Sequence, residues 1–234
     1  MKTALHLLSF CLLLSLTACI GDDFIDDSVD PEVRITNTID SLQIGTDFAF
    51  EVTFLDNVGR VDDDVPVTWT SSDPEIISVT SFGVATALAS GSATLTATAE
   101  FQSETYHEDF LVHVGESTTT IMEEDERRVG TIRTTSSYRL EGMFEMTTSD
   151  DGLLIEVDDT YITTSALPGF YLYLSNNPNS IANAIEIGEV TVFEGAHTYT
   201  VQGDGLGLDT YGYLLYYCKP FNIKVGDGKI EKPE

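Results

Sequence analysis

Short runs that alternate between apolar and polar residues follow one another along the chain from Val33 onward. They lack the 3.6-residue period of an amphipathic helix, and Gly, Asn, Asp and Pro separate them. This pattern predicts an all-β fold. The clearest predicted strands span residues 48–55, 65–70, 92–99, 110–114, 152–157, 170–174 and 211–218.

The predicted strands fall into two groups, each about the size of a small domain. A polar, Thr-rich and acidic stretch separates the groups. Many short strands with turn residues at this spacing are typical of β-sandwiches. We therefore expect two consecutive β-sandwich domains at residues 32–114 and 130–230, joined by a linker at residues 115–129.

The N-terminal residues have the order of a secretory signal peptide: Lys2, an apolar run from Leu5 to Leu16, and then small residues. The run is too short for a membrane-spanning helix, which needs about 20 apolar residues. Leu16-Thr17-Ala18-Cys19 resembles the lipobox of bacterial lipoproteins. The resemblance implies that residues 1–18 are a lipoprotein signal peptide and that Cys19 carries the lipid that anchors the chain in a bacterial membrane.

Residues 19–31 are acidic and contain too few apolar side chains to fold, so we expect a tether. No acidic residue follows Cys19 directly, which makes retention in the inner membrane less favoured, and the acidic stretch resembles a surface-export signal of bacterial lipoproteins. The expected location is the cell envelope, with the protein lipid-anchored in the outer membrane and either periplasmic or surface-exposed.

Charge and cysteine content limit the partners and the thiol chemistry that the protein can have. Loss of residues 1–18 removes Lys2 and no acidic residue, which changes the formal net charge from −28 to −29. Such an acidic protein is repelled by nucleic acid, so we expect no nucleic-acid partner. Cys11 leaves with the signal peptide and Cys19 is capped by lipid, which leaves Cys218 as the single free thiol and excludes an intrachain disulfide.

The first predicted domain carries a tryptophan strand around Trp69, a Ser-Ser-Asp-Pro turn at residues 71–74, a Gly-Val strand at Gly83 and the run Gly-Ser-Ala-Thr-Leu-Thr-Ala at residues 91–97. In this order they resemble the bacterial Ig-like domain, group two. Independently of that resemblance, Trp69 lies mid-strand between polar neighbours and is best explained as a core residue between two sheets. This domain is expected to be a spacer without chemistry of its own.

The second predicted domain carries Tyr-Leu-Tyr-Leu-Ser at residues 171–175 and Cys-Lys-Pro-Phe at residues 218–221. These motifs resemble the DM-thirteen domain, a β-sandwich family linked to electron transfer. The resemblance implies a redox role for the late cysteine, here Cys218. Two positions depart from the family pattern. Gly169 replaces an acidic residue, which removes a carboxylate, and Tyr217 replaces a tryptophan.

Strand alternation over residues 213–218 places Leu214, Tyr216 and Cys218 on one face, and both faces are apolar enough to be buried. A reactive cysteine needs a partly exposed, electropositive setting, whereas a cysteine in apolar surroundings is usually inert. The sequence leaves both alternatives open. Its candidate site is Cys218 with five neighbours: Tyr171, Tyr173, Tyr216, Tyr217 and Lys219.

No enzyme signature occurs in the sequence, so an enzyme is not the favoured class, and no metal-ligand spacing is present. No cofactor can be named. Two functions remain. The first is an electron-transfer accessory that uses Cys218 and acts with an envelope redox protein. The second is a non-catalytic surface binding or adhesion module for a glycan or a protein partner.

Overall fold

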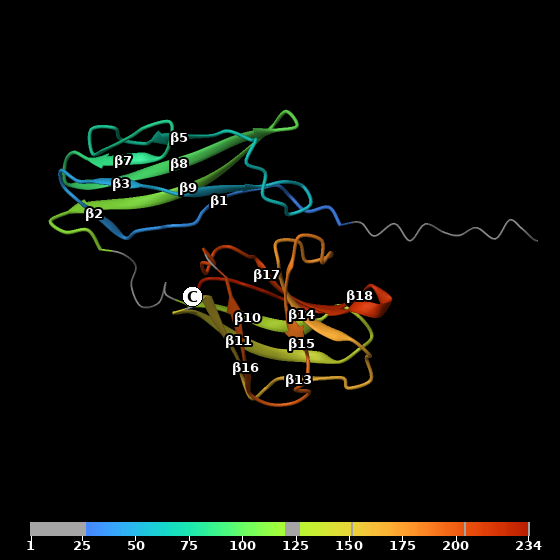
Figure 1. The fold of residues 1–234 in the computed structure, drawn as a ribbon. Helices are drawn as coiled ribbons and strands as arrows, with labels where there is room; N and C mark the ends of the chain where they lie inside the picture. The colour runs from blue at the N-terminus through green and yellow to red at the C-terminus, as the bar shows by residue number, and fades with distance from the viewer. Residues whose placement is uncertain (1–26, 120–126, 151, 204, 234) are drawn as a thin grey trace, which may run out of the picture.

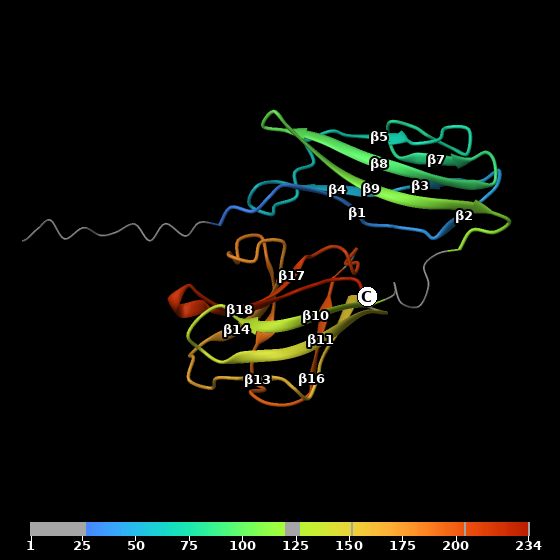
Figure 2. The ribbon, with the colours of Figure 1, turned by 180° about the vertical axis from the view of Figure 1, so that it is seen from behind.

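A computed structural model describes residues 27–119, 127–150, 152–203 and 205–233. The predicted signal peptide, Cys19 and most of the predicted tether lie outside these residues. Within them the chain forms two β-sandwiches, as the alternating pattern predicted, and the ribbon shows them as two bodies that lie against each other (Figures 1 and 2). The first ends with a strand that stops at Gly115, and the second begins with a strand at Arg127.

The first sandwich packs a four-stranded sheet, in the order β2-β9-β8-β5, against the sheets β1-β4 and β3-β7-β6. All pairs are antiparallel except β2 with β9, which is parallel. The strands are β1 (Glu32–Ile35), β2 (Ser41–Gln43), β3 (Asp47–Ala49), β4 (Val52–Leu55), β5 (Val67–Ser71), β6 (Ile77–Val79), β7 (Val84–Ala87), β8 (Gly91–Phe101) and β9 (Glu104–Gly115).

The predicted single strand at residues 48–55 is wrong, because the chain there forms two strands in two different sheets. β3 pairs with β7, and β4 pairs with β1. Between them, Phe50 N–H donates to the Gly83 carbonyl, and the Asn37 side chain bonds Ala49 O at 2.9 Å and Glu51 N–H at 2.5 Å. The backbone changes partners at Phe50 without losing its hydrogen bonds.

Trp69 lies in the core of the first sandwich, as predicted, with 6% of its surface exposed. Its ring lies 5.6 Å from that of Phe50, between centroids. The alternating alanines of β8 are buried beside it and let the two layers approach closely. His107 and His113 are exposed on β9.

The second sandwich is one nine-stranded sheet, in the order β15-β14-β17-β18-β10-β11-β12-β16, with β13 paired to β11. Its two edge strands, β15 and β16, approach each other, so the sheet folds over a single core. The strands are β10 (Arg127–Thr134), β11 (Leu140–Ser149), β12 (Gly152–Val157), β13 (Ile162–Thr163), β14 (Phe170–Ser175), β15 (Ile185–Glu189), β16 (His197–Gln202), β17 (Tyr213–Cys218) and β18 (Ile223–Lys229), with a 3-10 turn, η2 (Lys219–Phe221).

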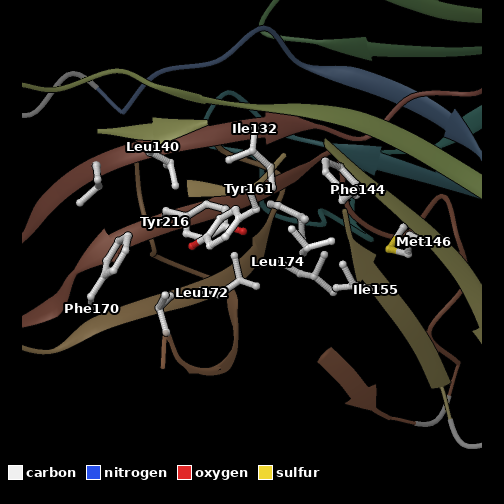
Figure 3. Packing of buried hydrophobic residues seen from close by; sticks show 14 of the residues in the cluster. Ile132, Leu140, Phe144, Met146, Ile155, Tyr161, Phe170, Leu172, Leu174 and Tyr216 are labelled. Carbon is white, nitrogen blue, oxygen red and sulfur yellow. The ribbon is translucent and has the colours of Figure 1, made fainter. Parts of the chain in front are cut away.

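Both faces of β17 are buried, as the sequence predicted. Leu214, Tyr216 and Cys218 belong to the large core between the two halves of the sheet, which Figure 3 shows in part. Leu215 and Tyr217 belong to a smaller cluster on the opposite face, together with Tyr173. The strand therefore separates two apolar environments.

Candidate functional site

Cys218 ends β17 and lies in the middle of the sheet, opposite Phe170 of β14 and Ile223 of β18. None of its surface is exposed. Its side chain points into the large core, and its Sγ donates a hydrogen bond to the Pro168 carbonyl at 3.2 Å. The sulfur is therefore enclosed by aliphatic and aromatic side chains, and its weak donor is satisfied.

This setting is that of an inert cysteine. A thiolate must reach an oxidant, a metal or a partner disulfide in order to react, and a solvent-exposed electropositive site favours that reaction. The Cys218 sulfur has no exposed surface through which a reagent could approach. In the folded chain it behaves as a small apolar side chain.

Two turns cover Cys218, and their close contact explains why glycine stands at position 169. Gly169 has a φ of +61°, and a Cβ placed there would lie 2.7 Å from Pro220 Cδ and Cγ. Lys219 N–H donates to Gly169 O at 3.0 Å, which ties the two turns together. A carboxylate at position 169 would have to displace Pro220, so the close contact between the turns requires glycine.

The remaining predicted site residues divide between the two faces of the sheet. Tyr216 lies beside Cys218 in the large core and has no exposed surface. Tyr173 and Tyr217 lie on the opposite face, and Tyr171 packs against them. Lys219 sits over the Tyr171 ring, with its Nζ 5.0 Å from the centroid. The structure therefore does not bring Lys219 to the thiol.

Glu186 bonds two of these residues on the face of the sheet opposite Cys218. Its Oε2 accepts hydrogen bonds from Lys219 Nζ at 2.7 Å and from the Tyr173 hydroxyl at 2.9 Å. The hydrogen bonds that Lys219 and Tyr173 donate to Glu186 lower the pKa of this carboxyl. The hydrogen bond between Lys219 and Glu186 also raises the pKa of Lys219. Burial raises the pKa of Tyr173 above its ordinary value. Lys219 and Glu186 therefore form a partly exposed ion pair beside Tyr171 and Tyr173.

Sequence reasoning missed Glu186 and Pro168. Glu186 meets Tyr173 because β15 pairs with β14, with a register shift between Leu172 and Tyr173. A bulge of this kind has no pattern in the sequence that would place a particular carboxylate beside Tyr173. Pro168 contacts the sulfur through its backbone carbonyl, which carries no side-chain signal.

A cleft of about 350 Å³ lies between the two sandwiches. Its lining mixes both signs of charge, which suits a polar ligand more than an apolar one. The charged lining residues are Glu32, Arg34, Glu108, Asp109, Arg128, Asp209, Lys229 and Lys232. Clefts between domains are frequent places for ligand binding.

Glu108 of β9 is a half-buried carboxylate of the cleft. One of its oxygens accepts a hydrogen bond from the Ile35 backbone N–H. Burial raises its pKa, and the neighbouring Glu32 carboxylate raises it further, against the effect of the Ile35 bond. Perturbed titratable groups in clefts are typical of binding sites, and also of structural ion-pair networks.

A larger hollow, of about 740 Å³, lies over β10, β11 and β12 on the second sandwich. Met143 is 53% exposed and contributes an apolar surface to it. The carboxylates of Glu145, Glu156 and Asp158 also line it. The sequence did not single out this surface.

The described residues contain no group of three His, Cys, Asp or Glu side chains placed to hold a metal ion. In the same part of the chain, no helix has the length and apolar character needed to cross a membrane.

Comparison with known proteins places a family match within the first sandwich. Residues 31–107 match the model of the bacterial Ig-like domain (group 2). No curated protein matches the chain. The family match agrees with the resemblance carried by the Trp69 strand and the Gly-Val strand, and it covers about a third of the sequence. The first sandwich is thus similar to bacterial Ig-like domains.

Proposed function

We propose that the chain is a lipid-anchored protein of the bacterial envelope in which an Ig-like spacer displays a second, non-catalytic binding sandwich. The signal peptide and the lipobox-like Leu16-Thr17-Ala18-Cys19 support the anchor. The family match at residues 31–107 supports the spacer. The partner would be a glycan or a protein of the envelope, held at the mixed-charge cleft between the sandwiches.

The burial of Cys218 is the observation that carries the choice of a binding role. The resemblance of the second domain to the DM-thirteen family implies an electron-transfer role through this thiol, with an envelope redox protein as partner. That role requires an accessible sulfur, whereas Cys218 has no exposed surface and donates to Pro168 O. We therefore prefer the binding module, and electron transfer becomes the second candidate.

Thiol labelling separates the two candidates. In the lipidated protein, Cys218 should remain unmodified by a thiol reagent under native conditions and react fully once the protein is denatured. The matched control is a Phe221→Cys variant in a Cys218→Ala background, because Phe221 is 62% exposed three residues away. The control should react at once. Rapid native modification of Cys218 would instead favour the redox role.

Loss of the thiol is the second test. A Cys218→Ala variant that remains folded should complement a deletion strain as fully as the wild type does, because a binding surface does not use the sulfur. Loss of complementation with unchanged stability would reject the non-catalytic role.

Binding of a partner at the cleft is tested with a photo-crosslinker in place of Tyr211, which lines the cleft. The comparison is a photo-crosslinker in place of Tyr138, which is exposed and absent from the cleft lining.

The anchor has its own test. Metabolic labelling with a radioactive fatty acid should mark the wild-type protein and the Cys218→Ser variant, and it should not mark the Cys19→Ser variant. The wild type should sediment with the outer membrane. Label on the Cys19→Ser protein would contradict the proposed lipidation site.

A further inference from the structure

Four polar atoms in the second sandwich are buried, and none of them meets hydrogen-bond geometry with a described residue, although the Tyr161 hydroxyl lies near enough to Tyr216 and Thr163 to interact with both. They are the hydroxyls of Tyr161, Tyr199 and Tyr216 and the Nε2 atom of His197. Tyr161 and Tyr216 have no exposed surface at all. A buried polar group that lacks a partner is costly, and most such groups in proteins bond to protein or to ordered water.

The four atoms belong to one cluster of rings. The His197 ring lies 4.6 Å from that of Tyr161 and 5.2 Å from that of Tyr199, between centroids. The rings of Tyr161 and Tyr216 lie 6.2 Å apart, and Figure 3 shows them side by side among aliphatic side chains. The cluster joins β16 and β17 to the turn that precedes β13.

The phenol and imidazole groups of the cluster suit a neutral ligand that both donates and accepts hydrogen bonds. His197 Nδ1 lies 2.9 Å from the Gly195 carbonyl, which only accepts, so Nδ1 carries a proton; in the tautomer whose proton is on Nδ1, Nε2 is an acceptor. The phenols can each donate and accept. Burial raises the pKa of Tyr199 to about 12 and raises that of Tyr161 as well, so these phenols stay protonated at neutral pH.

The charged groups buried in the second sandwich have partners of their own. Arg128 pairs with Asp209, and Asp227 pairs with Lys224. An ionic guest would therefore enter the Tyr161 cluster without a counter-charge, which is unfavourable in an apolar core. Water is the smallest neutral molecule that satisfies both the phenols and the imidazole.

We propose that the core of the second sandwich contains a hydrated site in which Tyr161, Tyr199, Tyr216 and His197 bind ordered water. This site is independent of the proposed binding role. It assigns the buried tyrosine hydroxyls a definite function, as ligands that fix β16 and β17 to the turn at Tyr161.

Removal of single hydroxyls tests the site through the sign of the stability change. Tyr161→Phe and Tyr216→Phe keep the ring and remove only the oxygen. If each hydroxyl binds water, the equilibrium constant for unfolding of each variant, measured by equilibrium denaturation, should be about tenfold larger than that of the wild type. If the hydroxyls lack partners, both variants should be as stable as the wild type or more stable, which overturns the proposal. Tyr138→Phe is the control, because its exposed hydroxyl should contribute little.

Two further measurements decide whether the site is shared and what it holds. The double variant should lose less stability than the sum of the single losses, because both hydroxyls contact the same water, and strictly additive losses would contradict a shared site. A crystal structure of the wild type at high resolution should show density at hydrogen-bond distance from the hydroxyls. The lack of density, or density at the shorter distances of metal coordination, would overturn the assignment to water.

Discussion

Arg34 of the first sandwich donates from Nη1 to Asn176 Oδ1 of the second sandwich at 2.8 Å, although the two residues are 142 positions apart. The same nitrogen also reaches the carbonyls of Asp209 and Thr210, at 3.1 and 3.2 Å. Asn176 in turn accepts from Gly212 N–H and donates to Thr210 O. One guanidinium therefore connects β1 to two loops of the other domain.

Arg34→Ala should loosen the arrangement of the two sandwiches without unfolding either one. Interfaces between domains are polar and permit relative motion unless specific contacts fix them. Small-angle scattering should show a larger maximum dimension for the variant than for the wild type. Arg139→Ala is the control, because it also removes one arginine but from an exposed pair with Glu141. Superimposable scattering curves for wild type and Arg34→Ala would argue against this role.

The loop that receives Arg34 is held by the buried Arg128. Arg128 donates to both carboxylate oxygens of Asp209, at 2.8 and 2.7 Å, and its side chain is 3% exposed. Asp209→Ala should therefore cost about 3 kcal/mol of stability, because it leaves a buried guanidinium without this partner. Chemical denaturation measures the loss. Glu145→Ala, which breaks the exposed pair with Arg127, should cost under about 1 kcal/mol, and equal losses would contradict the role of burial.

The contact between Gly169 and Pro220 gives a third prediction. Gly169→Asp should lower the free energy of unfolding by about 2–4 kcal/mol, through the left-handed backbone and the steric contact together. Gly195 is the control, because its φ is +87° but a Cβ there meets no atom within 4 Å. Gly195→Asp should cost only about 1 kcal/mol, from the backbone alone. A Pro220→Ala change should recover part of the loss at position 169, and no recovery would show that the contact is unimportant.

The sequence predicted the features that depend on local alternation. Trp69 between polar neighbours identified a core position, and the alternating residues 213–218 predicted a strand buried on both faces. Side-chain period and burial follow directly from a regular strand, so they can be read without knowledge of its partners.

The features that the sequence did not predict depend on which strands pair. Phe50 marks a change of sheet only because the Gly83 carbonyl and the Asn37 side chain lie beside it. Arg34 meets Asn176 through the docking of two domains, which leaves no periodic signal. The burial of Cys218 was one of two open alternatives, since the turn at Pro168 that covers it is set by tertiary structure.

Glu186 should stabilise the protein at neutral pH and lose this effect in acid. Its pKa is lowered by Lys219 and Tyr173, so the native state releases the proton more readily than the unfolded state does. The contribution is present above pH 4.5 and disappears as the pH falls through the native pKa. Glu186→Gln should lower Tm at pH 7 and have little effect in acid. Because the pair is exposed, the difference should be small and should shrink in high salt.

The contribution of Glu108 to stability should depend on pH in the opposite direction. Burial raises its pKa, so the native state holds the proton more tightly than the unfolded state, whose carboxyl titrates near 4.5. Its contribution is fully present below pH 4.5 and is lost as the pH rises through the native pKa. Glu108→Gln keeps an oxygen that can accept from Ile35 N–H and cannot ionise, so it should raise Tm at pH 7 and leave it unchanged below pH 4.5. Melting curves of both variants across this range check the signs together. A lower Tm for Glu108→Gln at pH 7 would mean that the ionised carboxylate contributes favourably to the cleft, which the burial of this side chain opposes.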